Sequence, residues 1–151
     1  MKNEKKYKKL CEVCNKIIDV DIYKQGKCSF CGWSNCIINE ENPDIVAMPN
    51  LISLNKAKQL YKEGRPFEPN LDEFIEALHG YSEMQFEYNG IYYAVELVFH
   101  ENKEPKISLY NSQTKETILF NDDKEFKDAA KIENQYLKDI WDKTTDRYWL
   151  Q

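Results

Sequence analysis

The sequence predicts an α+β protein in which a cysteine-rich N-terminal region precedes two helices and then a meander of strands. Three observations support this fold class. Two C-x-x-C pairs lie within the first 31 residues, two stretches with helical periodicity follow, and an Asn-Gly pair later interrupts a run of alternating apolar and polar residues. No apolar run reaches the roughly 20 residues that a membrane-spanning helix needs, so no membrane interaction is expected.

The cysteine-rich region has the spacing of a four-thiolate zinc site. Cys11 and Cys14 form the first pair, Cys28 and Cys31 form the second, and thirteen residues separate them. Each pair can make a tight turn, here called a knuckle, that directs both sulfurs toward one tetrahedral centre. The sequence therefore predicts a zinc ribbon that binds one Zn²⁺ ion.

The residues around the pairs support a structural ion. Asn15 follows the first pair and Gly32 the second, and both residue types tolerate the left-handed backbone that closes such a knuckle. Four thiolates leave no coordination position for water, so a structural role is favoured over a catalytic one. Redox-active dithiols and unrelated buried thiols are the alternatives. Cys36 is expected to be a buried or partly exposed thiol, with a replacement ligand as its alternative role.

Composition and turn residues divide the chain into four segments. We expect a basic tail over residues 1–9, the zinc ribbon and a connector over 10–50, a helical segment over 51–80 and an α+β unit over 81–151. Apolar residues between the cysteine pairs, within 17–23, predict a short hairpin.

Two helices are expected in the helical segment. Ser53 is the N-cap of a helix over about 54–63, which the next glycine ends. Asn70, with Glu73 three residues later, has the pattern of a capping box and begins the second helix.

The strongest turn signal of the chain is Asn89-Gly90, which favours a two-residue hairpin turn. That turn brings three pairs of apolar residues onto one face, and a slip by one residue would move all of them to the other face. The pairs are Tyr88 with Ile91, Phe86 with Tyr93 and Met84 with Val95.

Two further strands, over about 106–110 and 116–120, complete a predicted four-stranded antiparallel meander. A C-terminal helix, capped by Asp122 or Asp123 and broken near Asn134, is expected to cover its apolar face.

The same hairpin register places acidic residues together on the opposite face. Glu83 falls opposite Glu96, Glu87 shares their face, and Tyr92 adds an aromatic ring; we call these four residues the acidic sheet surface. Like charges in a cross-strand pair are mildly destabilising. A frayed strand end is one explanation, and a surface that binds a basic partner is the other.

Charge is unevenly distributed along the chain. Residues 1–32 contain eight Lys and four acidic residues, a net charge of +4, whereas residues 33–151 contain thirteen basic and twenty-two acidic residues, a net charge of −9. A zinc ion with four thiolates carries a local charge of −2, which explains part of the basic character near the cysteines. Nucleic-acid binding by the ribbon is therefore the second functional interpretation.

The chain carries no recognisable enzyme motif. It lacks G-x-G-x-x-G, G-x-x-x-x-G-K-[ST] and G-x-S-x-G, and its two histidines, His79 and His100, belong to no ligand motif. We therefore expect no enzymatic activity. No apolar segment follows the Lys-rich start, as it would in a signal peptide, so a cytoplasmic location is expected.

Four motifs in residues 10–64 point to a family. They are C-S-F-C-G-W at 28–33, P-D at 43–44, P-N at 49–50 and S-L-N-K-A-K-Q-L-Y-K-E-G at 53–64. Together they resemble the small bacterial cysteine-rich CPCC-type domain, although Glu12 stands where that family usually has proline. The resemblance implies zinc binding and little about activity.

A second pattern covers residues 84–143. F-E-Y-N-G-I-Y-Y, further strand segments and L-K-D-I-W-D at 137–142 are similar to small α+β domains of Gram-positive bacteria, some of which occur beside secreted toxins. CPCC-type modules also occur in proteins suspected of being immunity factors. The two resemblances imply a cytoplasmic immunity protein that occludes a basic toxin with its acidic sheet surface, while zinc stabilises the scaffold.

Overall fold

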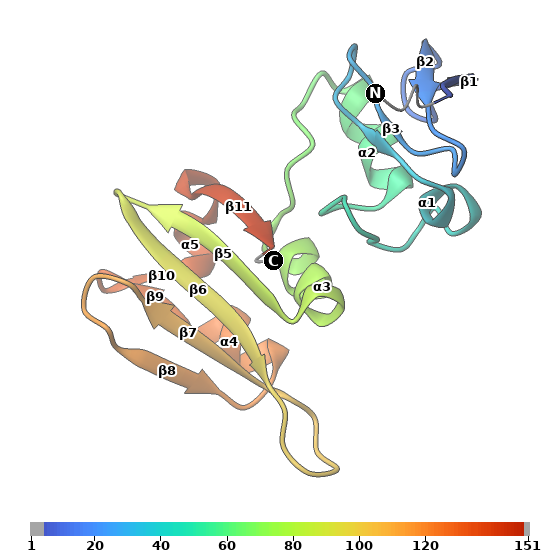
Figure 1. Ribbon diagram of the computed structural model, residues 1–151. Coiled ribbons are helices and arrows are strands. Elements are labelled where there is room, and N and C mark those ends of the chain that lie inside the picture. The colour runs from blue at the N-terminus through green and yellow to red at the C-terminus, as the bar shows by residue number, and fades with distance from the viewer. Residues whose placement is uncertain (1–4, 150–151) are drawn as a thin grey trace. The chain divides into compact units, whose positions relative to one another are not determined.

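The computed structural model describes residues 5–149 and divides the chain into two compact units, Met1–Glu68 and Pro69–Gln151. Figure 1 shows the elements of each unit. The first contains the four cysteines and the second contains a five-stranded antiparallel sheet with its helices. Within residues 5–149, no helix has the length and apolar character needed to cross a membrane.

The first unit is built from two short antiparallel strand pairs and two helices. Strand β1 (Tyr7–Leu10) pairs with β2 (Ile17–Val20), and β3 (Gly26–Lys27) pairs with β4 (Ser34–Asn35). Helix α1 (Ile37–Glu41) follows β4.

Helix α2 (Leu54–Lys62) supplies the apolar stripe of the first unit. The Ser53 hydroxyl accepts a hydrogen bond from the Lys56 amide, which confirms the predicted N-cap. Leu54, Ala57 and Leu60 are buried in one cluster with Trp33 and with residues of the cysteine region. The two cysteine knuckles and this helix therefore share a hydrophobic core.

Two expectations for the first unit need correction. The basic tail expected over residues 1–9 is wrong from Tyr7 onward, because Tyr7–Leu10 form β1; residues 1–4 lie outside the described residues. The short hairpin expected within residues 17–23 is also wrong, because this segment contains one strand, β2, whose ladder partner is β1. The N-terminal strand was missed because alternation is obscured by three lysines in the window from Lys6 to Lys9.

The second unit begins with helix α3 (Leu71–Tyr81), whose capping box is complete: the Asn70 side chain accepts from the Glu73 amide and the Glu73 side chain accepts from the Asn70 amide. The helical segment expected over 51–80 is thus divided, with α2 in the first unit and α3 in the second. Both helices occur where their caps placed them, but local signals did not indicate which core each one joins.

The sheet of the second unit has the strand order β11-β5-β6-β7-β8. Strands β5 (Glu83–Tyr88) and β6 (Ile91–Val98) pair in the register that Asn89-Gly90 predicted, with Phe86 opposite Tyr93. Strands β7 (Lys106–Asn111) and β8 (Thr117–Phe120) follow. The sequence predicted four strands; the fifth, β11 (Thr145–Trp149), pairs with β5 and was missed.

The apolar face of this sheet packs against helices. Phe86 lies edge-on to Phe74 of α3 with ring centroids 6.1 Å apart, and Trp141 lies 4.8 Å from Phe74 and 5.5 Å from Phe86. Phe120 of β8 contacts Phe126 of helix α4 (Asp123–Ala129) at 5.4 Å. Two groups of aromatic contacts, one around Phe86 and one between Phe120 and Phe126, therefore hold the helices on the sheet.

The single covering helix expected at the C-terminus is wrong. After α4 the chain forms a small hairpin, β9 (Lys131–Ile132) with β10 (Gln135–Tyr136), because Glu133 and Asn134 take left-handed φ values of 51° and 64°. Helix α5 (Leu137–Ile140) and a 3₁₀ turn, η1 (Trp141–Lys143), follow the hairpin. The break expected near Asn134 is at the centre of this turn.

Candidate metal centre

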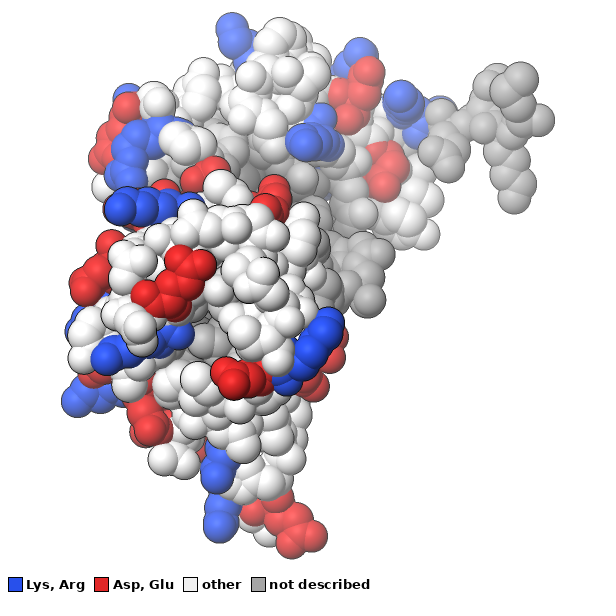
Figure 2. Space-filling model, turned by 90° about the vertical axis from the view of Figure 1, so that its left-hand side faces the viewer, with Lys and Arg blue, Asp and Glu red and all other residues white. Residues whose placement is uncertain are grey.

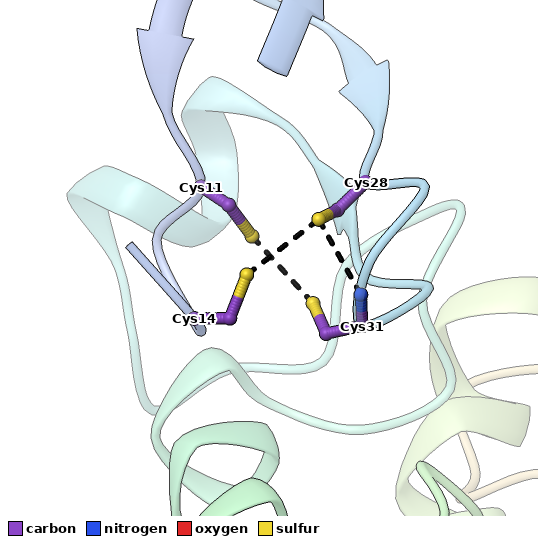
Figure 3. A group of neighbouring side chains, drawn as sticks. All are labelled: Cys11, Cys14, Cys28 and Cys31. Carbon is purple, nitrogen blue, oxygen red and sulfur yellow. Dashed lines mark hydrogen bonds between the residues drawn. The ribbon is translucent and has the colours of Figure 1, made fainter. Parts of the chain in front are cut away.

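Four sulfur atoms from two knuckles converge in the first unit (Figure 3). We call Cys11, Cys14, Cys28 and Cys31 the four-cysteine cluster, and their sulfurs all lie within 4.8 Å of one another. Cys11 Sγ is 3.7 Å from Cys31 Sγ, and Cys14 Sγ is 3.6 Å from Cys28 Sγ. Sulfurs at about 2.3 Å from a tetrahedral ion are about 3.8 Å apart. The cluster therefore has the dimensions of a metal site, and its cysteines are free thiols.

The two knuckles have the same backbone hydrogen bonds. In the first, Cys11 donates its amide to the Lys16 carbonyl at 2.8 Å and accepts from the Asn15 amide at 3.0 Å. In the second, Cys28 donates to the Trp33 carbonyl at 2.8 Å and accepts from the Gly32 amide at 2.9 Å. This shared pattern directs both pairs of sulfurs toward one point.

The residue that closes each knuckle is in the left-handed region, as the sequence predicted. Asn15 has φ of 60° and Gly32 has φ of 85°. Asn and Gly are the residue types that adopt this conformation at least cost. The local sequence therefore determines the shape of both turns.

Backbone amides in the second knuckle also favour a thiolate. Phe30 and Cys31 donate their N–H groups to Cys28 Sγ at 3.4 and 3.5 Å. Burial opposes ionisation of Cys28, but these two amides and hydrogen bonds from neighbouring thiols outweigh it and lower its pKa to about 7. For Cys31 and Cys14, burial is the largest effect and raises the pKa of each thiol. A cation at the centre would reverse that effect, because thiolates are the metal-binding form.

Asn35 is a residue of this centre that sequence reasoning missed. It is 2% exposed, its Nδ2 lies 3.4 Å from Cys11 Sγ, and its Oδ1 accepts from the Glu12 amide at 2.9 Å. Strand β4 thus holds the first knuckle through a single side chain. Its partners are 23 and 24 residues away in sequence, so no local pattern indicates them.

Cys36 is not part of the cluster. It is 3% exposed, and its thiol donates to Asn39 Oδ1 at 2.9 Å. Asn50 Nδ2 donates to the same Oδ1 at 3.0 Å and to the Ser34 carbonyl at 2.8 Å. The thiol is therefore a buried member of a polar network that joins α1 to the connector.

Lys9, which precedes the first knuckle, is already paired. Lys9 forms ion pairs with Glu12, at 3.4 Å, and with Glu40 of α1. Lys16 of the first knuckle lies over the exposed ring of Phe30 in the second knuckle, with its Nζ 5.9 Å from the ring centroid. Part of the basic charge of this region is thus balanced by carboxylates within the first unit.

The four residues of the acidic sheet surface lie in the second unit. Glu83 is directly opposite Glu96 in the β5–β6 ladder, and Glu87 is opposite Tyr92. Glu83, Glu96 and Tyr92 are exposed, while Glu87 is half-buried. These positions alternate with Met84, Phe86 and Val95 of the core, so they face away from the α3 side of the sheet.

The two histidines lie in the second unit. His79, in the last turn of α3, has its Nε2 2.7 and 2.8 Å from the carboxylate oxygens of Asp123 and so links α3 to α4. His100 follows β6. Among residues 5–149, the four-cysteine cluster is the one group of His, Cys, Asp or Glu side chains close enough to hold a metal ion.

Comparison with known proteins gives no identification: no family model, no curated protein and no solved structure matches this chain.

Proposed function

We propose that this chain is a non-enzymatic protein-binding module stabilised by one Zn²⁺ ion, and that it acts as a cytoplasmic immunity protein by occluding a basic toxin. The observation that carries the binding role is the acidic sheet surface, where Glu83 stands opposite Glu96 on an open face. The toxin-neutralising role rests in addition on the resemblance of the sequence to CPCC-type and immunity-type domains.

The donor set supports zinc as a structural ion in a ribbon. The four-cysteine cluster supplies four sulfurs and fills a tetrahedral sphere, leaving no position for a reacting water. Iron in a four-thiolate site would have the same donors but would absorb visible light and change oxidation state. Metal analysis of protein purified from a metal-replete host should give one zinc per chain and a colourless sample, whereas one iron per chain would reject the zinc assignment.

The charge of the second unit supports a basic partner. Residues 69–151 contain nine basic and seventeen acidic residues, which gives a net charge of −8. Residues 1–68 contain twelve basic and nine acidic residues, which gives a net charge of +3. The Glu83–Glu96 pair has a small repulsive cost in the free protein. A basic partner would remove that cost on binding, and complementary charge would speed its association.

The test begins with affinity capture from the native host, using the tagged, metal-loaded chain at low and high salt. We expect recovery of one basic secreted protein at near-equal amount. With that protein purified, the double variant Glu87→Lys, Glu96→Lys should slow association by about tenfold or more at low salt. The melting temperature should not fall, since Glu96→Lys replaces a like-charge pair with Glu83 by a pair of opposite charges.

The matched control is the double variant Glu76→Lys, Asp128→Lys, two exposed reversals on α3 and α4 that change net charge by the same amount without touching the acidic sheet surface. It should slow association much less than Glu87→Lys, Glu96→Lys. Equal effects of the two variants would reduce the interaction to overall charge and remove this surface as the binding site.

Nucleic-acid binding by the first unit is the alternative function. The exposed rings of Tyr23 and Phe30, 68% and 66% accessible, favour it because aromatic rings stack on bases. Against it, Lys8 pairs with Asp19 and Lys9 with Glu12. On the face drawn in Figure 2, basic and acidic side chains are interspersed. Binding of single-stranded DNA or RNA with a steep salt dependence would support this alternative.

A further inference from the structure

Strand β8 ends the sheet of the second unit, and its outer edge has no strand partner among the described residues (Figure 1). Thr117–Phe120 pair with β7 on one side only. Backbone donors and acceptors on such an edge can pair with another chain. The opposite edge is less regular, because the pairing of β11 with β5 shifts between Thr145 and Tyr148.

The ladder identifies which backbone groups of β8 face outward. The Asn111 amide donates to the Glu116 carbonyl at 2.9 Å, so Glu116 faces β7. Residues alternate in an antiparallel strand, so Ile118 and Phe120 also bond to β7. The N–H and C=O groups of Thr117 and Leu119 therefore point away from the sheet.

Both ends of this free edge are closed. The amide of Asn121, the next outward residue, already donates to Glu125 Oε2 at 2.6 Å. Lys115, the preceding outward residue, has a left-handed φ of 64° and is not extended. The edge thus offers two successive outward-facing residues, Thr117 and Leu119, whose backbone groups can pair with another strand.

Large apolar side chains accompany these positions. Ile118 is 51% exposed and Leu119 is 55% exposed, on opposite faces of the sheet. Edge strands usually carry charges, prolines or bulges that discourage pairing. The T-I-L-F sequence of β8 has none of these, and its register with β7 is regular.

We propose that β8 pairs antiparallel with β8 of a second copy of this chain, about a two-fold axis at Ile118. Thr117 then pairs with the partner's Leu119 and Leu119 with the partner's Thr117, which forms four backbone hydrogen bonds. The exposed Ile118 side chains meet on one face. Two five-stranded sheets become one continuous sheet of ten strands.

The neighbouring registers are worse. Pairing Leu119 with the partner's Leu119 puts Thr117 against Asn121, whose amide is already used, and Glu116 against Asp122, a like-charge pair. Pairing Thr117 with the partner's Thr117 puts Leu119 against the left-handed Lys115. The register centred on Ile118 avoids these conflicts and brings Lys115 across from Asn121, next to Asp122.

Charge also predicts how this dimer depends on salt. The net charge of −8 on the second unit makes two copies repel each other at long range. Added salt screens that repulsion without weakening the backbone pairing, so the dimer should strengthen as salt rises. Binding of the acidic sheet surface to a basic partner should weaken under the same change, so the two proposals can fail independently.

The test is sedimentation equilibrium of the full, metal-loaded chain from roughly 1 to 200 µM, the range in which a small interface associates. We expect conversion from the 18.0 kDa monomer to a species of twice that mass. Ile118→Lys should weaken the dimer by more than about tenfold, because two lysines would meet at the axis. Thr117→Pro should also weaken the dimer, because it removes an N–H group that points outward. It should leave the hydrogen bonds between β8 and β7 intact, because that N–H does not bond to β7.

Phe99→Lys is the matched control, because Phe99 is 68% exposed and lies outside β8. It should dimerise like the unmodified chain. Hydrogen exchange at rising concentration should protect the Thr117 and Leu119 amides selectively. A monomer across the whole range, or a dimer that survives both β8 variants, would overturn the proposal. A circular-dichroism melt of each β8 variant shows whether it has folded. If one of them has not, the dimerisation of the other variant tests the proposal.

Discussion

Asn35 bridges the two halves of the four-cysteine cluster: its Nδ2 lies 3.4 Å from Cys11 Sγ while its backbone belongs to β4, the strand that follows the second knuckle. The same side chain accepts the Glu12 amide at 2.9 Å. A residue that follows the second cysteine pair therefore positions the first pair.

Asn35→Ala should weaken metal binding by about tenfold, because residues that hydrogen-bond to metal ligands typically have effects of that size. It should also destabilise the first unit by about 1–3 kcal/mol, since the Glu12 amide loses its partner. Competition with a chromophoric chelator measures the affinity. Asn55→Ala is the control, because Asn55 is exposed and its side chain bonds to Asp44, away from the four-cysteine cluster. Equal chelator competition by the two variants would contradict the role of Asn35.

Metal removal should unfold the first unit and leave the second folded. The four-cysteine cluster is part of the core that also contains Trp33 and Leu60, whereas the aromatic cluster around Phe86 is in the other unit. A structural metal site contributes its binding free energy to folding. Hydrogen-exchange mass spectrometry with and without a strong chelator should show loss of protection in residues 7–62 and retained protection in 84–98.

Two cysteine substitutions provide controls for that experiment. Cys28→Ser should reproduce the effect of the chelator and lower the metal content, because it removes one sulfur donor. Cys36→Ser should retain a full complement of metal, because Cys36 bonds to Asn39 instead. Loss of metal in Cys36→Ser would contradict the place of Cys36 outside the four-cysteine cluster. Simultaneous loss of protection in both units would contradict the division into two units.

Two glycine-to-alanine changes should have opposite signs. A Cβ at Gly26 would lie 2.4 Å from the Asp19 carbonyl oxygen, so Gly26→Ala should destabilise the first unit by roughly 1–3 kcal/mol. A Cβ at Gly80, in the last turn of α3, meets no atom within 4 Å. Gly80→Ala should stabilise the second unit by roughly 0.5–1 kcal/mol. Chemical denaturation followed separately in each unit measures both changes.

Tyr93 should make the second unit less stable at alkaline pH. Burial, together with the negative charge of Glu133 and the neighbouring Tyr88, raises the pKa of Tyr93 above its usual 10.0. Above that pH the unfolded chain releases a proton that the folded chain keeps, so the free energy of unfolding falls as pH rises. Well below pH 10, Tyr93 is protonated in both the folded and the unfolded chain, so its contribution to the free energy of unfolding does not change with pH.

Tyr93→Phe should reduce that alkaline loss while keeping the ring that stacks on Phe86 at 5.4 Å. Denaturant melts of both proteins at pH 7 and at pH 9 to 11 give the comparison, and the difference at pH 7 measures effects unrelated to ionisation. Parallel pH profiles would show that Tyr93 does not contribute.

Features that depend on short-range sequence were predictable. The register of β5 and β6 follows from Asn89-Gly90, because a two-residue turn leaves one pairing that keeps the apolar residues together. The starts of α2 and α3 follow from Ser53 and Asn70, whose side chains bond three residues ahead. The two knuckles follow from cysteine spacing with Asn15 and Gly32.

Features that depend on partners far away in the sequence were not predictable. Strand β11 pairs with β5 about sixty residues earlier in the chain, and the C-terminal hairpin depends on left-handed Glu133, a residue type that gives no turn signal. The assignment of α3 to the sheet depends on Phe74 meeting Phe86 and Trp141. Periodicity marked these apolar faces without indicating what would cover them.

The sequence alone therefore determined the parts whose partners lie within a few residues: the knuckles, the helix caps and the hairpin register. Tertiary structure decided which helix joins which core, that Asn35 supports Cys11 and that β8 ends the sheet with a free edge. The physical reason is the sequence separation over which each interaction acts. Turns and caps are fixed by local hydrogen bonds, whereas burial selects among distant surfaces that look alike along the chain.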